Sequence, residues 1–187
     1  MENVGKTTAL IVGGSSGIGK ATAELLLKRD ISVWLLGRKE EKLRAAKLEL
    51  APLGDVEVFA VDLSSWAAVE AFAEVIARAA VNIRYLVNAA GVFSPKPFLD
   101  HAAADYDAYH DLNKATFFLT QVVARRMKDN GGGAIVNVGS MWARQAVKAT
   151  PSSAYSMAKA GLHALTQHLA MELASFNIRV NTVSPAV

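Results

Sequence analysis

Short apolar runs alternate along the chain with longer stretches in which apolar residues recur at helical spacing. The apolar runs predict buried strands over Thr7–Val12, Ile31–Leu36, Val56–Val61, Ile83–Val87, Ala134–Val138 and Ile178–Val183. The helical spacing predicts helices over Lys20–Arg29, Glu40–Leu50, Ala67–Ala79, Asp105–Lys128 and Ser152–Phe176. Strands and helices therefore alternate from one end of the sequence to the other.

This alternation predicts an α/β fold, a doubly wound parallel sheet of the Rossmann type with six strands. Strands that are apolar throughout are buried on both faces, and parallel neighbours need long crossover connections. In such sheets ligands bind beyond the carboxyl ends of the strands. The segments that begin at Gly13, Asp62, Asn88 and Ser140 each follow a predicted strand, so we expect them to line one crevice.

The composition fits one folded domain over residues 1–187. Hydrophobic residues make up 52% and charged residues 20% of the sequence, a balance that argues against a disordered chain. The net charge of +3 is small and both signs are interspersed, so we expect no nucleic-acid partner. The sequence contains no cysteine, and neither a secretory signal nor an apolar run of about 18 residues is present. We expect a soluble, cytoplasmic protein without a membrane partner.

A glycine-rich turn follows the first predicted strand. Gly13, Gly17 and Gly19 are spaced Gly-x-x-x-Gly-x-Gly and precede a helix. Glycines at such a turn let backbone N–H groups approach a pyrophosphate, which a helix N-terminus attracts. The alternative is that these glycines serve only a tight turn. Their position between a strand and a helix favours the dinucleotide site.

The end of the second predicted strand bears on the choice of nucleotide. An acidic residue there binds the ribose 2′-hydroxyl of NAD, whereas an arginine accommodates the 2′-phosphate of NADP. The strand ends in Gly37 and Arg38, and no carboxylate occupies this place. The sequence therefore favours NADP(H) over NAD(H). The alternative is that Arg38 is a solvated charge beside Lys39 and Glu40.

Tyr155 and Lys159 are candidates for acid–base chemistry. They are four residues apart in a predicted helix, so their side chains project from the same face. A free tyrosine has a pKa of about 10, and a neighbouring ammonium lowers it by favouring the phenolate. An exposed pair without a chemical role is the alternative for this spacing taken alone.

Several motifs occur together in the order typical of one family. They are Gly13-x-x-x-Gly17-Ile18-Gly19, Asn88-Ala89-Ala90-Gly91, Ser140 and Tyr155-x-x-x-Lys159. In this order they resemble the short-chain dehydrogenases/reductases, and the resemblance spans nearly the whole chain. It implies an oxidoreductase that transfers hydride between a nicotinamide nucleotide and a carbonyl or secondary alcohol.

The resemblance also implies roles for individual residues. Tyr155 would be the general acid/base, Lys159 would lower its pKa and bond the nicotinamide ribose, and Ser140 would hold the substrate oxygen. Asn113 matches the family asparagine that supports a proton-relay water. Hydrogen bonds from Tyr155 and Ser140 suit the negative charge that develops on a carbonyl oxygen, so no metal is required. The four histidines are assigned to the surface or to packing.

The cofactor contacts implied by the resemblance extend over several turns. They are Gly13, Ser15, Ser16, Gly17, Ile18, Gly19, Arg38, Asp62, Leu63, Asn88, Ala89, Ala90, Gly91, Tyr155, Lys159 and Pro185. Asp62 would bond the adenine amine, and Pro185 would border the nicotinamide. We expect Ser64 and Ser65 to cap the next helix and to leave Asp62 free.

Family members usually continue past this proline with a glycine, a substrate lid and a seventh strand. Residue 186 is alanine at that glycine position. We therefore expect a single dinucleotide-binding domain over residues 1–187 that lacks the lid and the seventh strand. Trp142 and Gln145 are possible contacts to a small carbonyl or alcohol substrate, whose identity the sequence leaves open.

Two alternative functions and a homo-oligomeric state also bear on the prediction. A non-catalytic NADP(H)-binding scaffold or sensor would not need all of Asn113, Ser140, Tyr155 and Lys159. An epimerase or dehydratase shares Tyr-x-x-x-Lys but typically has another glycine spacing and a larger C-terminal region. Apolar residues beyond one stripe on two helices suggest a homodimer or homotetramer; they are Phe117, Phe118, Leu162, Leu165 and Leu169.

Overall fold

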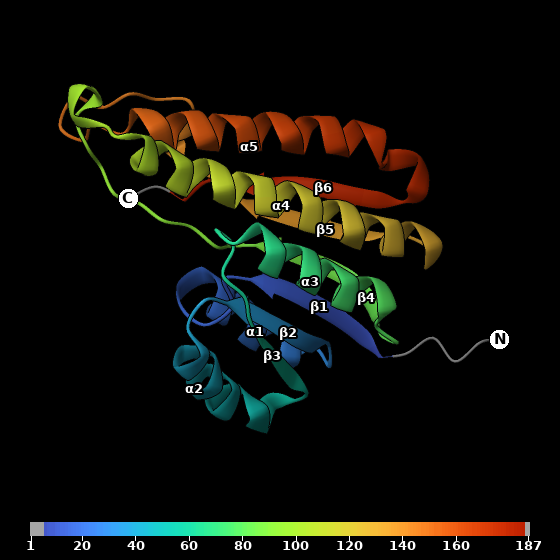
Figure 1. The fold of residues 1–187 in the computed structure, drawn as a ribbon. Coiled ribbons are helices and arrows are strands. Elements are labelled where there is room, and N and C mark those ends of the chain that lie inside the picture. The colour runs from blue at the N-terminus through green and yellow to red at the C-terminus, as the bar shows by residue number, and fades with distance from the viewer. Residues whose placement is uncertain (1–5, 186–187) are drawn as a thin grey trace.

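A computed structural model describes residues 6–185 and contains one parallel sheet flanked by helices (Figure 1). The strands are β1 Thr7–Val12, β2 Ser32–Gly37, β3 Val56–Ala60, β4 Asn82–Asn88, β5 Gly133–Val138 and β6 Ile178–Val183. The helices are α1 Gly17–Leu27, α2 Glu40–Leu50, α3 Trp66–Arg78, α4 Ala103–Asp129 and α5 Ser153–Glu172. Ala186 lies outside the described residues.

The six strands follow the order β3-β2-β1-β4-β5-β6, and every neighbouring pair is parallel. The chain runs outward from β1 to one edge and then returns to build the other half from β4. The order therefore reverses between β1 and β4, which is where ligands bind in sheets of this kind. The predicted doubly wound sheet is confirmed.

Both faces of the sheet are covered, because alternate side chains of each strand point to opposite sides. On β1, Ala9 and Ile11 pack with residues of α1 and α2, whereas Leu10 and Val12 pack with residues of α3 and α4. Figure 1 shows α3, α4 and α5 along one face. Burial on both sides explains why the strands are apolar at almost every position.

Several boundaries differ from the predicted ones. Helix α1 begins at Gly17 rather than at Lys20, because the end of the glycine turn already forms its first turn. Helix α5 ends at Glu172, and the residues up to Phe176 form a separate 3-10 turn. Asn177 then adopts φ 58°, a left-handed conformation that a helix cannot continue through. Within residues 6–185, no helix is both long and apolar enough to span a membrane.

Candidate active site

The turns after β1 and β4 pack backbone against backbone. Gly13 has φ +87°, and a Cβ atom there would lie 2.5 Å from the amide nitrogen of Ala90. The amides of Gly13 and Gly14 donate hydrogen bonds to the carbonyl of Leu36, at 2.8 and 3.1 Å. The close approach of Gly13 to Ala90 places the glycine turn beside the turn after β4, at the point where the strand order reverses.

The start of α1 has the properties of a phosphate cradle. Gly17 has φ +53°, and a Cβ atom there would meet nothing within 4 Å, so its outer side is open. A Cβ atom at Gly19 would instead collide with the carbonyl oxygen of Gly13, so only glycine allows this close packing of helix on turn. Ser16 and Ile18 are exposed at the same place, and Ser15 is half-buried. Free backbone N–H groups at a helix N-terminus bind anions.

Arg38 and Asp62 follow β2 and β3 at the same edge of the sheet, and both are exposed. Asp62 does not cap α3, as expected, because the N-cap is Ser65; the Asp62 Oδ1 accepts hydrogen bonds from the amide and hydroxyl of Ser64, at 3.0 and 2.7 Å. These bonds lower the pKa of Asp62, and the positive charge of Arg38 lowers it further. Ser65 caps α3 by accepting the amide of Ala68 at 3.4 Å, as predicted for one of the two serines. Leu63 is half-buried.

Asn88 belongs to a buried hydrogen-bond network that sequence reasoning missed. Its Nδ2 donates to Thr120 Oγ1 at 3.0 Å and to Asn137 Oδ1 at 2.8 Å. Asn137 Nδ2 in turn donates to Thr166 Oγ1 at 2.9 Å. The network crosses from α4 through β4 and β5 to α5, and it links the two helices that carry Asn113 and Tyr155. Of the segment Asn88–Gly91, Asn88, Ala90 and Gly91 also line the cavity described next.

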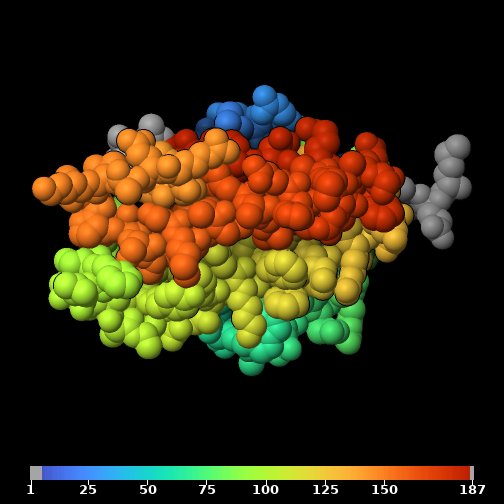
Figure 2. All heavy atoms as spheres, turned by 90° about the horizontal axis from the view of Figure 1, so that it is seen from above, coloured from blue at the N-terminus to red at the C-terminus, as the bar shows by residue number. Residues whose placement is uncertain are grey.

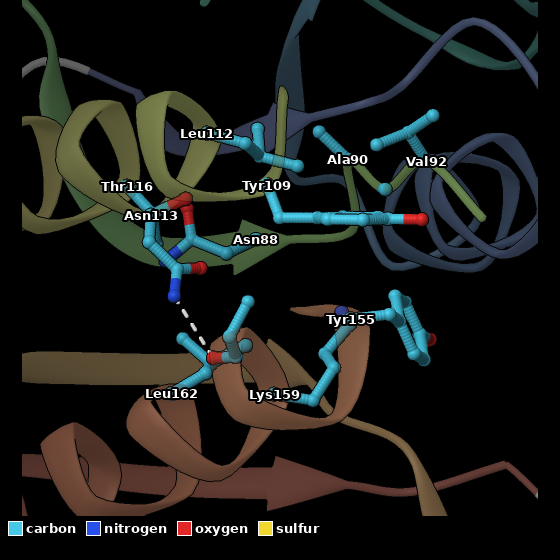
Figure 3. A pocket seen from close by; sticks show the side chains of 12 residues that line it. Asn88, Ala90, Val92, Tyr109, Leu112, Asn113, Thr116, Tyr155, Lys159 and Leu162 are labelled. Carbon is cyan, nitrogen blue, oxygen red and sulfur yellow. Dashed lines mark hydrogen bonds between the residues drawn. The ribbon is translucent and has the colours of Figure 1, made fainter. Parts of the chain in front are cut away.

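Tyr155, Lys159 and Asn113 line one narrow cavity between α4 and α5 (Figure 3). Lys159 Nζ donates to the carbonyl of Val138 at 2.7 Å and lies 5.8 Å from the centroid of the Tyr155 ring. Asn113 Nδ2 donates to the carbonyl of Ala158 at 2.8 Å, which fixes α4 to α5 within one turn of both residues. Burial lowers the pKa of Lys159, because it disfavours the charged ammonium.

Ser140 follows β5, near these residues in the fold but not among those that line the cavity. It is 5% exposed, and its Oγ accepts the amide of Trp142 at 3.2 Å. This bond starts the short 3-10 turn Met141–Ala143. The hydroxyl of Ser140 keeps a hydrogen to donate, because in this bond its oxygen is the acceptor.

Tyr109, which lines the cavity, and His163, which does not, make contacts that the sequence did not indicate. The Tyr109 hydroxyl donates to the carbonyl of Ser94 and accepts its amide, both at 3.0 Å. His163, assigned from sequence to the surface or to packing, lies 3.1 Å through Nε2 from Ser184 Oγ, next to Pro185. Burial lowers the pKa of His163, and the charges of Arg144 and Lys159 lower it further. Spacing along the chain gives no signal for either contact.

Comparison with known proteins identifies the family. The sequence model of the short chain dehydrogenase family matches residues 7–187 of this chain. The chain belongs to this family. It is 33% identical over 186 residues to an NAD-dependent glycerol dehydrogenase of Listeria innocua, covering 99% of this chain and 72% of that protein. It is 34% identical to a D-threitol dehydrogenase of Mycolicibacterium smegmatis, covering 96% of this chain and 69% of that protein.

Solved structures agree with the family assignment. The L-sorbose reductase of Gluconobacter frateurii, solved with NADPH and L-sorbose, superposes with a TM-score of 0.90 at 30% identity. The match covers 98% of this chain and 70% of the reductase. The short-chain dehydrogenase resemblance drawn from the sequence is therefore confirmed. Among residues 6–185, no group of three or more His, Cys, Asp or Glu side chains is placed to hold a metal ion.

Proposed function

We propose that this short-chain dehydrogenase transfers hydride between NADP(H) and a carbonyl or secondary alcohol, with Tyr155 as the general acid/base. The observation that carries the proposal is the meeting of Tyr155, Lys159 and Asn113 around one cavity beside the glycine turn. The relatives named for glycerol, threitol and sorbose support an alcohol or ketone as the reacting group.

The residues at the carboxyl ends of the strands fit a nicotinamide nucleotide. Gly13, Gly17 and Gly19 leave room at the start of α1 for a pyrophosphate that side chains would obstruct. Arg38 would face the adenosine ribose and Asp62 the adenine, while Pro185 and Lys159 would border the nicotinamide end. When bound, the nucleotide supplies or accepts the hydride at the substrate carbon.

The proton chemistry belongs to the chain itself. The Tyr155 hydroxyl donates its proton to a carbonyl oxygen during reduction, and the Tyr155 phenolate accepts a proton from the alcohol during oxidation. Ser140 donates a second hydrogen bond to that oxygen, where negative charge develops. The ammonium of Lys159 favours release of the Tyr155 proton. The adjoining cavity has a volume of about 20 Å³, enough for one water molecule that could pass protons between Lys159 and solvent.

A preference for NADP(H) is proposed from Arg38, since its guanidinium can bind a 2′-phosphate with two hydrogen bonds. Titration with NADPH and with NADH, followed by nicotinamide fluorescence, tests this. We expect tighter binding of NADPH, and Arg38→Ala should weaken it roughly ten- to hundredfold, about 1.4 to 2.8 kcal/mol. Lys39→Ala, also an exposed cation, is the matched control. If the Arg38→Ala variant binds NADPH as tightly as the wild-type chain does, Arg38 is only a solvated charge.

The Tyr155→Phe variant distinguishes a catalytic role of Tyr155 from nucleotide binding alone. This variant keeps the aromatic ring and removes the proton that is transferred. We expect kcat to fall by roughly 10²- to 10⁴-fold while nucleotide affinity stays within about threefold, because general acid–base catalysis contributes that much. If the wild-type chain binds the nucleotide but turns over no carbonyl or alcohol, it is a scaffold or sensor instead.

We also propose that α4 and α5 meet a second copy of this chain. A groove between them is lined by Phe117, Leu165 and Leu169 and flanked by Arg125 and Glu172. Figure 2 shows α4 and α5 side by side on the face toward the viewer. Leu162, included in the sequence-based interface, is 6% exposed and lines the inner cavity, so it cannot meet a partner.

The assembly is tested by light scattering on a sizing column. Leu165→Lys would bury a charge in a dimer and should shift the protein to monomer. Leu48→Lys, at a 77% exposed position on α2, is the control and should leave the mass unchanged. A wild-type chain that elutes as a monomer at all concentrations would refute this part of the proposal.

A further inference from the structure

Three aromatic rings from separate segments meet beside the cavity. Phe93, in the segment after β4, has its ring centroid 4.9 Å from that of Tyr155, at an interplanar angle of 66°. Phe93 also stacks nearly parallel to Trp142, with ring centroids 6.4 Å apart and an interplanar angle of 20°. Phe93 is 49% exposed and Trp142 is half-buried, so both offer ring surface to solvent beside Tyr155. We call Phe93 and Trp142 the aromatic wall.

Hydrogen bonds and an ion pair hold the segment that carries Phe93 in place. The Tyr109 hydroxyl bonds both the amide and the carbonyl of Ser94, the residue that follows Phe93. Two residues further on, the Lys96 amide donates to the carbonyl of Pro151 at 3.0 Å. The Lys96 ammonium also pairs with Asp105 at 2.6 Å. These bonds join the segment after β4 to α4 and to the loop before α5, so the Phe93 ring is positioned before any substrate arrives.

The chemistry of this surface differs from that of a polyol site. Each hydroxyl of a polyol needs a hydrogen-bond partner when it leaves water, and the faces of Phe93 and Trp142 provide none. A flat apolar group loses no hydrogen bond there, and it gains contact with two rings whose π-faces favour stacked or edge-to-face neighbours. We propose that the aromatic wall selects carbonyl compounds or alcohols that carry an aryl group next to the reacting carbon. This inference rests on the proposed hydride transfer.

Turnover of three ketones tests the aromatic wall with the full chain and its preferred nucleotide. They are acetophenone, which carries an aryl group, cyclohexyl methyl ketone, which has similar volume but is not flat, and dihydroxyacetone, a small ketone with two hydroxyl groups. We expect kcat/KM to be highest for acetophenone. Phe93→Ala should lower kcat/KM for acetophenone roughly tenfold, about 1.4 kcal/mol, and should change that for dihydroxyacetone less than about twofold.

Two more variants separate an aromatic contact from bulk and from folding. Phe93→Leu keeps an apolar side chain without a ring, so it should restore turnover of cyclohexyl methyl ketone more fully than that of acetophenone. Leu48→Ala is the control, since Leu48 is 77% exposed and lies on α2, away from the cavity. It should leave the ratio of kcat/KM between the ketones unchanged.

Binding gives a readout that does not depend on turnover. Saturation-transfer NMR on the protein–nucleotide complex should detect acetophenone, and Phe93→Ala should weaken that signal. Preference for dihydroxyacetone, or an equal loss for all ketones in Phe93→Ala, would overturn the aromatic wall while leaving hydride transfer intact. No turnover of any ketone by a nucleotide-bound chain would overturn the proposed function, and the NMR comparison would then decide the aromatic wall by itself.

Discussion

The buried amide network around Asn137 should be essential for stability, and Asn137→Ala tests it. Asn137 is 1% exposed and Asn88 is 4% exposed, so water cannot replace the bonds that are lost. The substitution removes the bonds to Asn88 at 2.8 Å and to Thr166 at 2.9 Å. Each bond contributes roughly 1 kcal/mol net, and the Asn88 amide proton left unpaired costs roughly 1 to 3 kcal/mol. We expect a total loss of at least about 3 kcal/mol in the free energy of unfolding.

Urea and thermal unfolding followed by circular dichroism measure this loss. For a protein of this size, about 3 kcal/mol corresponds to a fall in Tm of roughly 6 to 12 °C. Asn181→Ala is the control, because Asn181 is exposed on β6 and its replacement should change the free energy of unfolding by less than about 0.5 kcal/mol.

A double-mutant cycle then identifies the hydrogen bond as the cause. Once Asn88 is alanine, no amide proton is left unpaired by Asn137→Ala, so the second substitution should cost less. We expect a coupling free energy of about 1 to 2 kcal/mol between the two positions. A Tm that falls by less than about 2 °C in Asn137→Ala, or effects that add within about 0.5 kcal/mol, would refute the reasoning.

The glycine turn and the half-buried side chains of His163 and Lys159 give three more predictions. Gly13→Ala should lower Tm and weaken nucleotide binding at least tenfold, about 1.4 kcal/mol, because Gly13 has φ +87° and its added Cβ would collide with Ala90. Gly91→Ala is the control for Tm, since a Cβ atom there would meet nothing within 4 Å. The lowered pKa of His163 means that the unfolded chain binds more protons than the folded chain just below pH 6.5. The free energy of unfolding should therefore decrease as the pH is lowered through this range. His163→Gln should flatten this slope of Tm against pH, and an unchanged slope would contradict it. Lys159→Met should reduce kcat at least tenfold without lowering Tm, since burial of its ammonium is unfavourable.

The architecture could be predicted from the sequence because its signals are local. Each strand is a run of apolar residues, and each crossover is a helix long enough to return to the same edge of the sheet. The spacing of Gly13, Gly17 and Gly19 predicted the turn after β1, whose geometry excludes side chains at Gly13 and Gly19. Boundaries were less predictable, since Gly17 to Gly19 read as turn residues although they form the first turn of α1.

Part of the candidate site was also predictable, because Tyr155 and Lys159 are one helical turn apart and must share a face. The contacts that hold them in place were not. Asn88 meets Asn137 from 49 residues away, His163 meets Ser184 from 21, and Phe93 reaches Trp142 and Tyr155 across three segments. Such pairs depend on strand order and register, which bring the segments together only after the sheet has formed. The sequence by itself determined the layered fold, the glycine turn and the spacing of Tyr155 and Lys159. Only the tertiary structure decided which buried amides, rings and loops surround them, because those neighbours come from parts of the chain with no local relation.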